Sequence, residues 1–416
     1  MKQSIYNRVV NLDNNNVAVY NTLTGALSVF EQDEYKHYFE NDISKLTSDE
    51  LECMKRNTFF VSDDTDELAS VLFKRQKQIL TPTIPTYRVL VTTACNARCS
   101  YCFEKGIEFV SMDKRVADAV IEFILKESQG CPKIKVQWFG GEPMLNLDII
   151  GYITEGLNDR FDGDIMYSMI TNGSLLTISN ARELVRLGIK KIQITLDGDK
   201  AVYEERKSYV DKNITFETIW FNIGVALAEG LSVVVRVNYD KSTMTSATHL
   251  INSLGRCFSN NEKFSCYPFP IYGTYNSRSQ LSTGKEQLLF FQKLLVKVGI
   301  IDANQLFRSS LGVKDGPCMA YSSKGFFISP TGELFKCSID MKDNVGNVFD
   351  GVRYNKKFFE WCNLDLSEAC RSCDLLPVCQ GGCRAGALGK LPVTCMRDKD
   401  LVDDLIKLMI PSDIKG

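Results

Sequence analysis

The clearest pattern in the chain is an alternation between short apolar runs and longer stretches with apolar residues every three or four positions, from Tyr87 to about Tyr272. The runs predict strands and the stretches between them predict helices. The expected strands are Arg88–Thr92, Lys133–Trp138, Ile165–Ile170, Lys191–Leu196, Ser232–Asn238 and Phe264–Tyr267. The expected helices are Asp113–Glu127, Leu147–Arg160, Asn180–Leu187, Phe216–Glu229 and Thr245–Leu254. This alternation predicts an α/β fold with a parallel sheet or an incomplete barrel.

The first 80 or so residues follow a different pattern. Asn7–Val10 and Val17–Phe30 alternate apolar with polar residues around turn-forming sequences, which predicts strands. Helical patterns follow at Glu31–Glu40, Asp49–Arg56 and Asp64–Ile79. Two prolines, Pro82 and Pro85, then mark a domain boundary. We therefore divide the chain into an N-terminal domain (1–82), the strand–helix region (83–275), a bridging segment with a helix (276–317) and a cysteine-rich C-terminal region (318–416).

Composition narrows the function classes. The chain has 416 residues, a net charge of −2 and no long run of like charges. Bulk charge therefore indicates no nucleic-acid or membrane-surface partner. The N-terminus lacks a secretory pattern, and no stretch reaches the ~18 apolar residues of a membrane-spanning helix. We expect a cytoplasmic protein.

Cysteine usage is unusual, because 15 cysteines accompany only two histidines, His37 and His249. In a reducing compartment, clustered thiols are metal ligands more often than disulfides. A site with several ligands must then be built mostly from thiolates, which suits iron–sulfur clusters or a zinc ion with four cysteines.

The first cysteine cluster directly follows the first strand of the strand–helix region and contains Cys95, Cys99 and Cys102. Three thiolates can hold three irons of a [4Fe–4S] cube and leave the fourth iron open. A zinc loop would normally need a second pair of ligands. Spacing alone therefore favours the iron–sulfur reading over zinc or chance clustering.

This spacing, C-x3-C-x-aromatic-C after a first strand, resembles the signature of the radical S-adenosylmethionine (SAM) superfamily. The resemblance implies a partial (β/α)6 barrel, and an open iron that chelates SAM and cleaves it to a 5′-deoxyadenosyl radical. Gly140-Gly141-Glu142-Pro143 ends the second strand and resembles the family's GGEP motif, so Glu142 and nearby backbone would receive the methionyl amino group. Tyr101 would lie near the adenine, and Thr171 and Asn172 near the ribose.

Other polar residues at strand ends are weaker candidates. Arg206 or Arg236 could pair with the SAM carboxylate. Asp197 and Asn238 lie at neighbouring positions. Each of these residues could equally belong to a structural turn or to the surface.

The C-terminal cysteines have a second spacing pattern. Its members are Cys318, Cys337, Cys370, Cys373, Cys379, Cys383 and Cys395. Spacing alone does not choose between zinc and iron, although seven cysteines are too many for one zinc ion. The pattern resembles the SPASM domain that follows many radical SAM barrels and holds two auxiliary [4Fe–4S] clusters.

That resemblance implies two ligand sets and three clusters in total. Cys318, Cys337 and Cys383 would bind auxiliary cluster I, and Cys370, Cys373, Cys379 and Cys395 would bind auxiliary cluster II. Some SPASM proteins have a further cysteine shortly after the first, and none occurs between Cys318 and Cys337. Cluster I would then keep an open iron or borrow Cys257, Cys266 or Cys362. Otherwise these three, with Cys53 and Cys131, are expected to be small buried apolar residues.

SPASM radical SAM enzymes usually modify peptides or proteins. The N-terminal domain resembles the winged-helix-like domain with which maturases of ribosomally made peptides hold a precursor's leader as an added strand. A simple extension that caps the barrel is the alternative reading. We expect a peptide maturase that forms a thioether or C–C crosslink, with a leader-bearing precursor as substrate and a reductase, flavodoxin or ferredoxin as electron donor.

Two other functions are alternatives to the peptide maturase. A sulfatase-maturating enzyme would carry an Asp after Cys337, where this chain has Ser338 and then Asp340. A non-catalytic iron–sulfur electron carrier would have no use for an open three-cysteine site or a GGEP motif.

Overall fold

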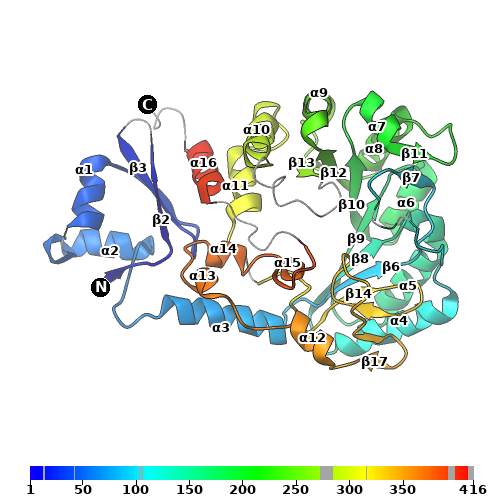
Figure 1. Cartoon of the computed structure of the whole chain (residues 1–416), viewed down its shortest axis with the longest axis horizontal. Helices are drawn as coiled ribbons and strands as arrows, with labels where there is room; N and C mark the ends of the chain where they lie inside the picture. The colour runs from blue at the N-terminus through cyan, green and yellow to red at the C-terminus, as the bar shows by residue number, and fades with distance from the viewer. Residues whose placement is uncertain are drawn as a thin grey trace.

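The computed structural model describes residues 1–12, 15–41, 43–102, 104, 106–271, 284–314, 316–391 and 399–410. Its centre is a sheet of six neighbouring parallel strands in the order β6-β8-β9-β10-β12-β13, which confirms the predicted partial barrel (Figure 1). These strands are β6 (Thr86–Leu90), β8 (Lys133–Phe139), β9 (Asp164–Thr171), β10 (Ile189–Leu196), β12 (Ser232–Tyr239) and β13 (Phe264–Pro270). All six predicted strands are present, with ends shifted by a few residues.

Buried and more exposed residues alternate along the strands, so the two faces of the sheet differ in character. In β8, Ile134, Val136 and Trp138 are fully buried, whereas Lys135 is exposed and Gln137 is half-buried. Because successive side chains of a strand point to opposite faces, the apolar set packs under the outer helices and the polar set lines the concave face.

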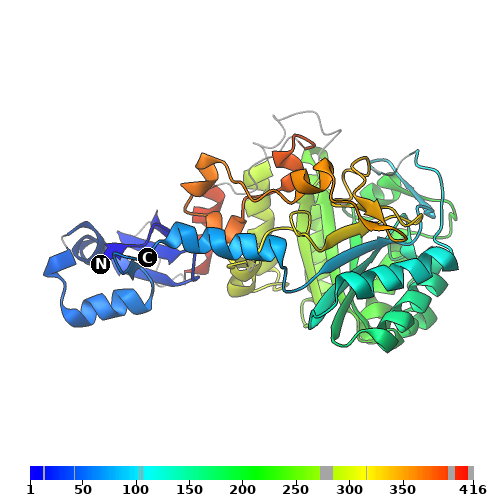
Figure 2. The same cartoon turned by 90° about the horizontal axis from the view of Figure 1, so that it is seen from below.

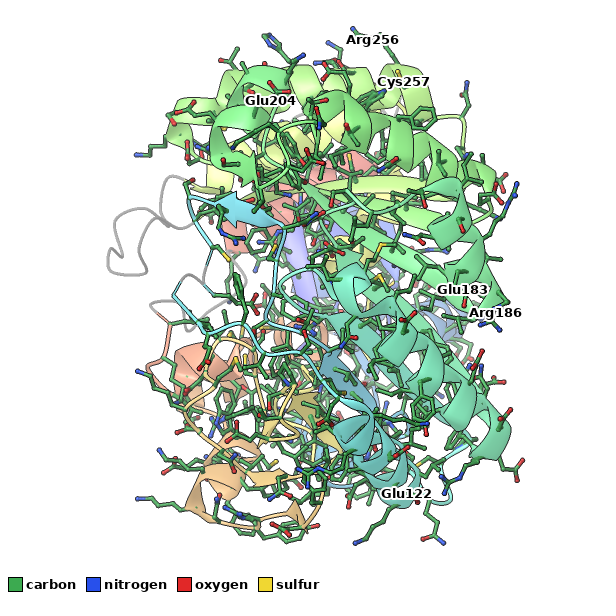
Figure 3. All side chains as sticks on the ribbon, turned by 90° about the vertical axis from the view of Figure 1, so that its right-hand side faces the viewer. Glu122, Glu183, Arg186, Glu204, Arg256 and Cys257 are labelled. Carbon is green, nitrogen blue, oxygen red and sulfur yellow. The ribbon has the colours of Figure 1, made fainter. Side chains whose placement is uncertain are left out.

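The outer helices cover the convex face of the sheet. They are α4 (Lys114–Glu127), α5 (Leu147–Arg160), α6 (Ile178–Arg186), α7 (Lys200–Arg206), α8 (Phe216–Ala228) and α9 (Met244–Phe258). Asp113 caps the first turn of α4 by accepting a hydrogen bond from the Val116 amide. Figure 3 shows Glu122, Glu183 and Arg186 at the outer surface of this helical layer. Their exposed ion pairs contribute little stability, so the buried apolar faces hold the layer in place.

The C-terminal region extends the barrel sheet. β14 (Gly325–Ile328) pairs in parallel with β6, and β15 (Leu334–Phe335) pairs antiparallel with β14. The remaining strands and helices of this region are short: β16 (Gly346–Asn347), β17 (Gly351–Val352), α12 (Lys356–Trp361), α13 (Glu368–Arg371), α14 (Leu376–Cys379), α15 (Arg384–Ala387) and α16 (Lys399–Met409). The cysteine-rich region therefore begins as part of the barrel wall.

The N-terminal region forms a separate lobe at the far end of the molecule (Figures 1 and 2). Its antiparallel sheet contains β2 (Asn7–Asn11), β3 (Asn16–Asn21) and β4 (Leu27–Glu31) in that order. The helical segments that follow are α1 (Gln32–Tyr35), η1 (Lys36–Glu40), η2 (Ile43–Lys45), α2 (Ser48–Arg56) and α3 (Glu67–Leu80), and β1 (Lys2–Gln3) pairs with β5 (Phe60–Val61). The order of strands and helices agrees with the sequence prediction.

Both faces of the N-terminal sheet are covered. Val19 packs with Phe39 and Phe59 on the side of the local helices. Tyr20 packs on the other side against Phe307 and donates a hydrogen bond to the Leu311 carbonyl at 2.9 Å. This second side meets α11 (Ala303–Leu311) and α16, so the lobe is anchored on the C-terminal region.

The bridging segment contains α10 (Gly284–Lys297) and α11, while its residues 276–283 lie outside the described part of the chain. The four domain boundaries stay predictions. Among the described residues, none of the helices has the length and apolar character needed to cross a membrane.

Candidate active site

The three predicted cluster cysteines lie in one loop at the carboxyl end of β6. The strand β7 (Ala97–Cys99) pairs antiparallel with β11 (Lys207–Tyr209), a contact that the sequence pattern did not predict. Outside this pairing, the Val210 amide donates to the Asn96 carbonyl at 2.9 Å and the Ser100 amide to the Arg206 carbonyl at 3.1 Å. The loop is therefore held on both sides of Cys99 by the segment after α7.

The three thiols suit an iron–sulfur cluster by their chemistry. Cys95, Cys99 and Cys102 are free and partly buried. Burial raises the pKa of each thiol, and that of Cys99 reaches about 11 although the Lys207 ammonium opposes the change. Because cluster ligands are thiolates, binding of a cluster here would release protons and stabilise the loop. The donor set fits a [4Fe–4S] cluster with one iron left open.

Glycine is needed at positions 140 and 141 because the GGEP loop and the loop that leads into Cys95 approach each other closely there. A Cβ at Gly141 would lie 2.4 Å from the Ala94 carbonyl oxygen, and a Cβ at Gly140 would lie 2.7 Å from that of Thr92. The Gly141 amide donates to the Thr92 carbonyl at 2.9 Å, and the Glu142 amide donates to the Ala94 carbonyl at 2.9 Å. The GGEP loop is thus bonded along its backbone to the residues that lead into Cys95.

The Glu142 carboxylate, which the sequence predicts to receive the methionyl amino group, is hydrogen-bonded within the protein. It is fully buried and accepts hydrogen bonds from the Thr171 hydroxyl at 2.8 Å, the Asn172 amide at 2.7 Å and the Met144 amide at 3.1 Å. Burial raises the pKa of Glu142, and these hydrogen bonds oppose the change. The carboxylate thus joins the ends of β8 and β9. The contacts of Glu142 and nearby backbone with the methionyl amino group, and of Thr171 with the ribose, stay predictions.

Asn172, which the sequence predicts near the ribose, contacts the cluster loop. Its side-chain amide donates to the Asn96 side-chain oxygen at 2.8 Å, and the Asn96 amide donates to the Ser174 hydroxyl at 2.9 Å. Sequence reasoning missed Asn96, which stands between Cys95 and Cys99. Its only sequence signal was its position inside the cysteine motif.

A buried network connects the predicted adenine residue to the next strands. The Tyr101 hydroxyl donates to Asp197 at 2.6 Å, and the Asn238 amide donates to the other oxygen of Asp197 at 2.9 Å. Arg236 donates to Asn238 at 3.0 Å and its guanidinium lies 3.7 Å from the centre of the Phe269 ring. Burial, and then the Asp197 charge, raise the pKa of Tyr101 well above its usual value.

The two arginines proposed for the SAM carboxylate are both engaged within the protein. Arg206 forms an ion pair with Asp240, and one of its terminal nitrogens is buried without a hydrogen-bond partner among the described residues. Arg236 is held in the network just described. Pro143, the last residue of the predicted motif, begins a short helical turn and is buried.

The residues predicted for auxiliary cluster I gather beside β14 and β15. Cys337 and Cys383 contact the same apolar group of Ala320, Trp361 and Ala385. Burial raises the pKa of the Cys337 thiol, and the neighbouring thiols of Cys318 and Cys383 raise it further. Cys318 and Cys383 are therefore neighbours of Cys337, and their binding of one cluster stays a prediction.

The residues predicted for auxiliary cluster II lie on α13, α14 and the turns around them. Cys370 and Cys373 flank the end of α13, and Cys379 ends α14. Cys395 lies outside the described residues. Three left-handed residues, Gln380, Gly381 and Gly382, follow Cys379 and return the chain toward Cys383.

Arg75, on the helix α3, holds this turn in place. Its side chain is 1% exposed and donates to the Gln380 carbonyl at 3.2 Å and the Leu364 carbonyl at 2.9 Å. The guanidinium also lies 4.9 Å from the centre of the Tyr321 ring. A helix that begins in the N-terminal lobe thereby supports the cysteine-bearing loops.

The remaining cysteines divide by exposure. Cys266 and Cys362 are buried as expected and Cys131 is only partly buried. Cys53 and Cys257 are exposed, and Figure 3 shows Cys257 on the outer surface. The expectation of burial was wrong for these two because their helices turn them to solvent. Among the described residues, no three His, Cys, Asp or Glu side chains are placed to hold a metal ion, and this includes the predicted cluster cysteines.

Residues 89–241 match the family model of the Radical SAM superfamily. The chain carries a radical SAM domain. This confirms the prediction of a radical SAM enzyme, and the superfamily implies a [4Fe–4S] cluster and SAM as cofactors.

Curated relatives match only part of this chain. The chain is 34% identical over 109 residues to the uncharacterized protein MJ0907 of Methanocaldococcus jannaschii, which covers 26% of this chain and 37% of that protein. It is 33% identical over 162 residues to GTP 3′,8-cyclase of Staphylococcus saprophyticus, and the match covers 37% of this chain and 45% of that protein. The chain thus spans less than half the length of these relatives.

Solved structures share the wider radical SAM architecture. anSMEcpe with bound AdoMet aligns with a TM-score of 0.60 at 17% identity, covering 78% of this chain and 96% of that chain. Streptococcus suis SuiB bound to the precursor peptide SuiA aligns with a TM-score of 0.53 at 14% identity, covering 95% and 98%. These likenesses confirm the predicted radical SAM/SPASM fold class.

Proposed function

We propose that this radical SAM enzyme is a peptide maturase that modifies a ribosomally made precursor peptide. The observation that carries the proposal is the combination, in one chain, of a free three-cysteine loop at the barrel end, a cysteine-rich extension of the barrel sheet and an N-terminal lobe with an open sheet edge. With a cluster and SAM bound, the site supplies a 5′-deoxyadenosyl radical. Cys95, Cys99 and Cys102 would hold that cluster.

The leader of the precursor is assigned to the N-terminal lobe. Among the described strands, β4 pairs only with β3, so its outer edge offers main-chain groups for an added strand. A cavity of about 420 Å³ lies beside this edge and is lined by β4, Glu34, Met409 and Ile410. SuiB, which was solved with its precursor peptide, aligns over this part as well.

We assign the reaction on the substrate as formation of a crosslink, and we favour a thioether over a C–C bond. Two auxiliary clusters on the seven C-terminal cysteines belong to this proposal, and an open iron on cluster I would accept a substrate thiolate. The alternative conversion of cysteine or serine to formylglycine needs a carboxylate base near Cys337. Asp340, the nearest downstream carboxylate, is buried and ion-paired with Lys390.

The test is anaerobic reconstitution with iron and sulfide, followed by mass spectrometry of a cysteine-containing precursor peptide from a neighbouring gene. A SAM-dependent loss of two hydrogens, absent when the leader is deleted, supports the proposal. Conversion of the cysteine of a sulfatase-derived peptide to an aldehyde, with the precursor unchanged, would replace it with the formylglycine function.

A further inference from the structure

The interior of the partial barrel contains a cavity of about 1630 Å³ that reaches solvent at the end opposite the cluster loop. Its wall is the concave face of the sheet, and six of the lining residues are Arg88, Lys135, Gln137, Ser168, Gln193 and Tyr267. Lys133, Asp164 and Lys190 also line it and stand at or next to the first residues of β8, β9 and β10. The opening is therefore at the amino ends of the strands, whereas the predicted cluster lies at their carboxyl ends.

The lining of this cavity is strongly basic, in contrast to the whole chain. Its cationic members are Arg88, Lys133, Lys135, Lys190, Lys191 and Lys314. Asp164 is the one carboxylate among the described lining residues, and it is paired with Lys133 at 3.3 Å. The chain as a whole has a net charge of −2. Such a concentration of one sign in a concave surface attracts ligands of the opposite sign.

Arg88 adds a buried guanidinium with a free donor to this basic lining. Its Nε is buried and has no hydrogen-bond partner among the described residues, and the guanidinium lies 5.7 Å from the centre of the Phe139 ring. A buried donor without a partner costs free energy, which a carboxylate would recover. The thiols of Cys318 and Cys337, assigned to predicted cluster I, are also close enough to act on the Arg88 charge. Tyr267 faces the same cavity and holds Gln193 by a hydrogen bond of 3.0 Å, so the polar wall is preformed.

The size of the cavity favours a peptide over a small molecule. Small-molecule sites usually have about 300–1,000 Å³, and this cavity is larger. Apolar side chains, including Met169 and Val234, lie among the polar ones. A chain of alternating apolar and acidic residues would match this lining.

We propose that the barrel interior binds an acidic segment of the peptide substrate, with its carboxylates paired to Arg88 and to the lysines at the opening. This inference rests on the proposed peptide-maturase function and adds a substrate class to it. A nucleoside triphosphate is the competing anionic ligand, and GTP serves as its probe in the test.

The experiment measures fluorescence anisotropy of labelled (Gly-Glu)5 and its neutral counterpart (Gly-Gln)5 with the anaerobically reconstituted full chain. The acidic peptide is expected to bind at least about tenfold more tightly at low salt, with the difference shrinking as salt rises. The double variant Lys135→Glu/Lys191→Glu should lose at least about tenfold in affinity for it. Lys126→Glu, on the outer helix α4, is the matched control and should bind as the wild type does.

The inference is overturned if the two peptides bind equally, or if Lys126→Glu loses as much affinity as the double variant. It is also overturned if GTP displaces (Gly-Glu)5 at lower concentrations than unlabelled peptide does. Modification of the precursor is measured separately. If a precursor whose Asp and Glu residues are changed to Asn and Gln is modified as fast as the original, the acidic specificity fails and the maturase function stands. If the acidic peptide binds through the lysines but the chain modifies no precursor, the maturase function fails.

Discussion

Gly141→Ala tests whether the close approach between the GGEP loop and the cluster loop matters for SAM cleavage. The new Cβ would lie 2.4 Å from the Ala94 carbonyl oxygen and 2.6 Å from that of Thr93, where ordinary van der Waals contact begins at 3.4 Å. Both neighbours are backbone atoms, so neither can rotate away. One of the two loops must therefore move by about 1 Å.

The size of the effect follows from this displacement. Overpacking in a rigid region costs about 1–3 kcal/mol of unfolding free energy. A misplacement of about 1 Å at a reacting site can cost about 100-fold in rate. Since Ala94 directly precedes Cys95, we expect deoxyadenosine release to fall by about 100-fold and stability to fall by 1–3 kcal/mol.

The assay combines urea unfolding with chromatographic measurement of deoxyadenosine from SAM and dithionite under anaerobic conditions. Gly224→Ala is the matched control, because no atom lies within 4 Å of its added Cβ in the helix α8. It should keep wild-type SAM cleavage and gain about 1 kcal/mol of stability. Wild-type rates and stability in Gly141→Ala would refute the steric reasoning.

Three further substitutions test how the lobes and the site are held. Arg8→Ala removes a two-point ion pair with Asp403, at 2.6 and 2.8 Å, and should lower the unfolding free energy by about 1–3 kcal/mol in urea titrations. Arg75→Met leaves the buried Gln380 carbonyl and the partly buried Leu364 carbonyl without this donor, which should cost about 1–3 kcal/mol by the same measurement and reduce the iron content after reconstitution. Tyr101→Phe removes the donor to Asp197 and should raise the KM for SAM while the cluster's absorbance is retained.

The barrel could be predicted from the sequence because its strands are long and strictly patterned. In β8 and β12, each second residue must be apolar to pack under the helices, so periodicity alone locates them. The strands β14, β15 and β11 have only two to four residues, and they are strands because they pair with β6, with β14 and with β7. Pairing between distant segments leaves no periodic signal in so short a run.

The cysteines of the candidate site could be predicted because their chemistry fixes their spacing. The role of Glu142 could not, because its three donors come from residues 144, 171 and 172, and only the folded sheet brings the last two to it. The same holds for Asn96 and for Arg75, whose partners are about 76 and 300 residues away in the chain. Motifs identify ligands, whereas the residues that position them depend on tertiary contacts.

Deoxyadenosine release by the Cys99→Ala variant tests the central claim most directly. The wild type, the variant Cys373→Ala of predicted cluster II and the exposed-cysteine control Cys53→Ala are measured beside it, each after anaerobic reconstitution, with SAM and dithionite. Cys99→Ala is expected to release no deoxyadenosine, and Cys53→Ala is expected to release wild-type amounts. Cys373→Ala should retain at least some uncoupled cleavage of SAM. Full SAM cleavage by Cys99→Ala would contradict the assignment of the Cys95–Cys102 loop as the SAM-cleaving site.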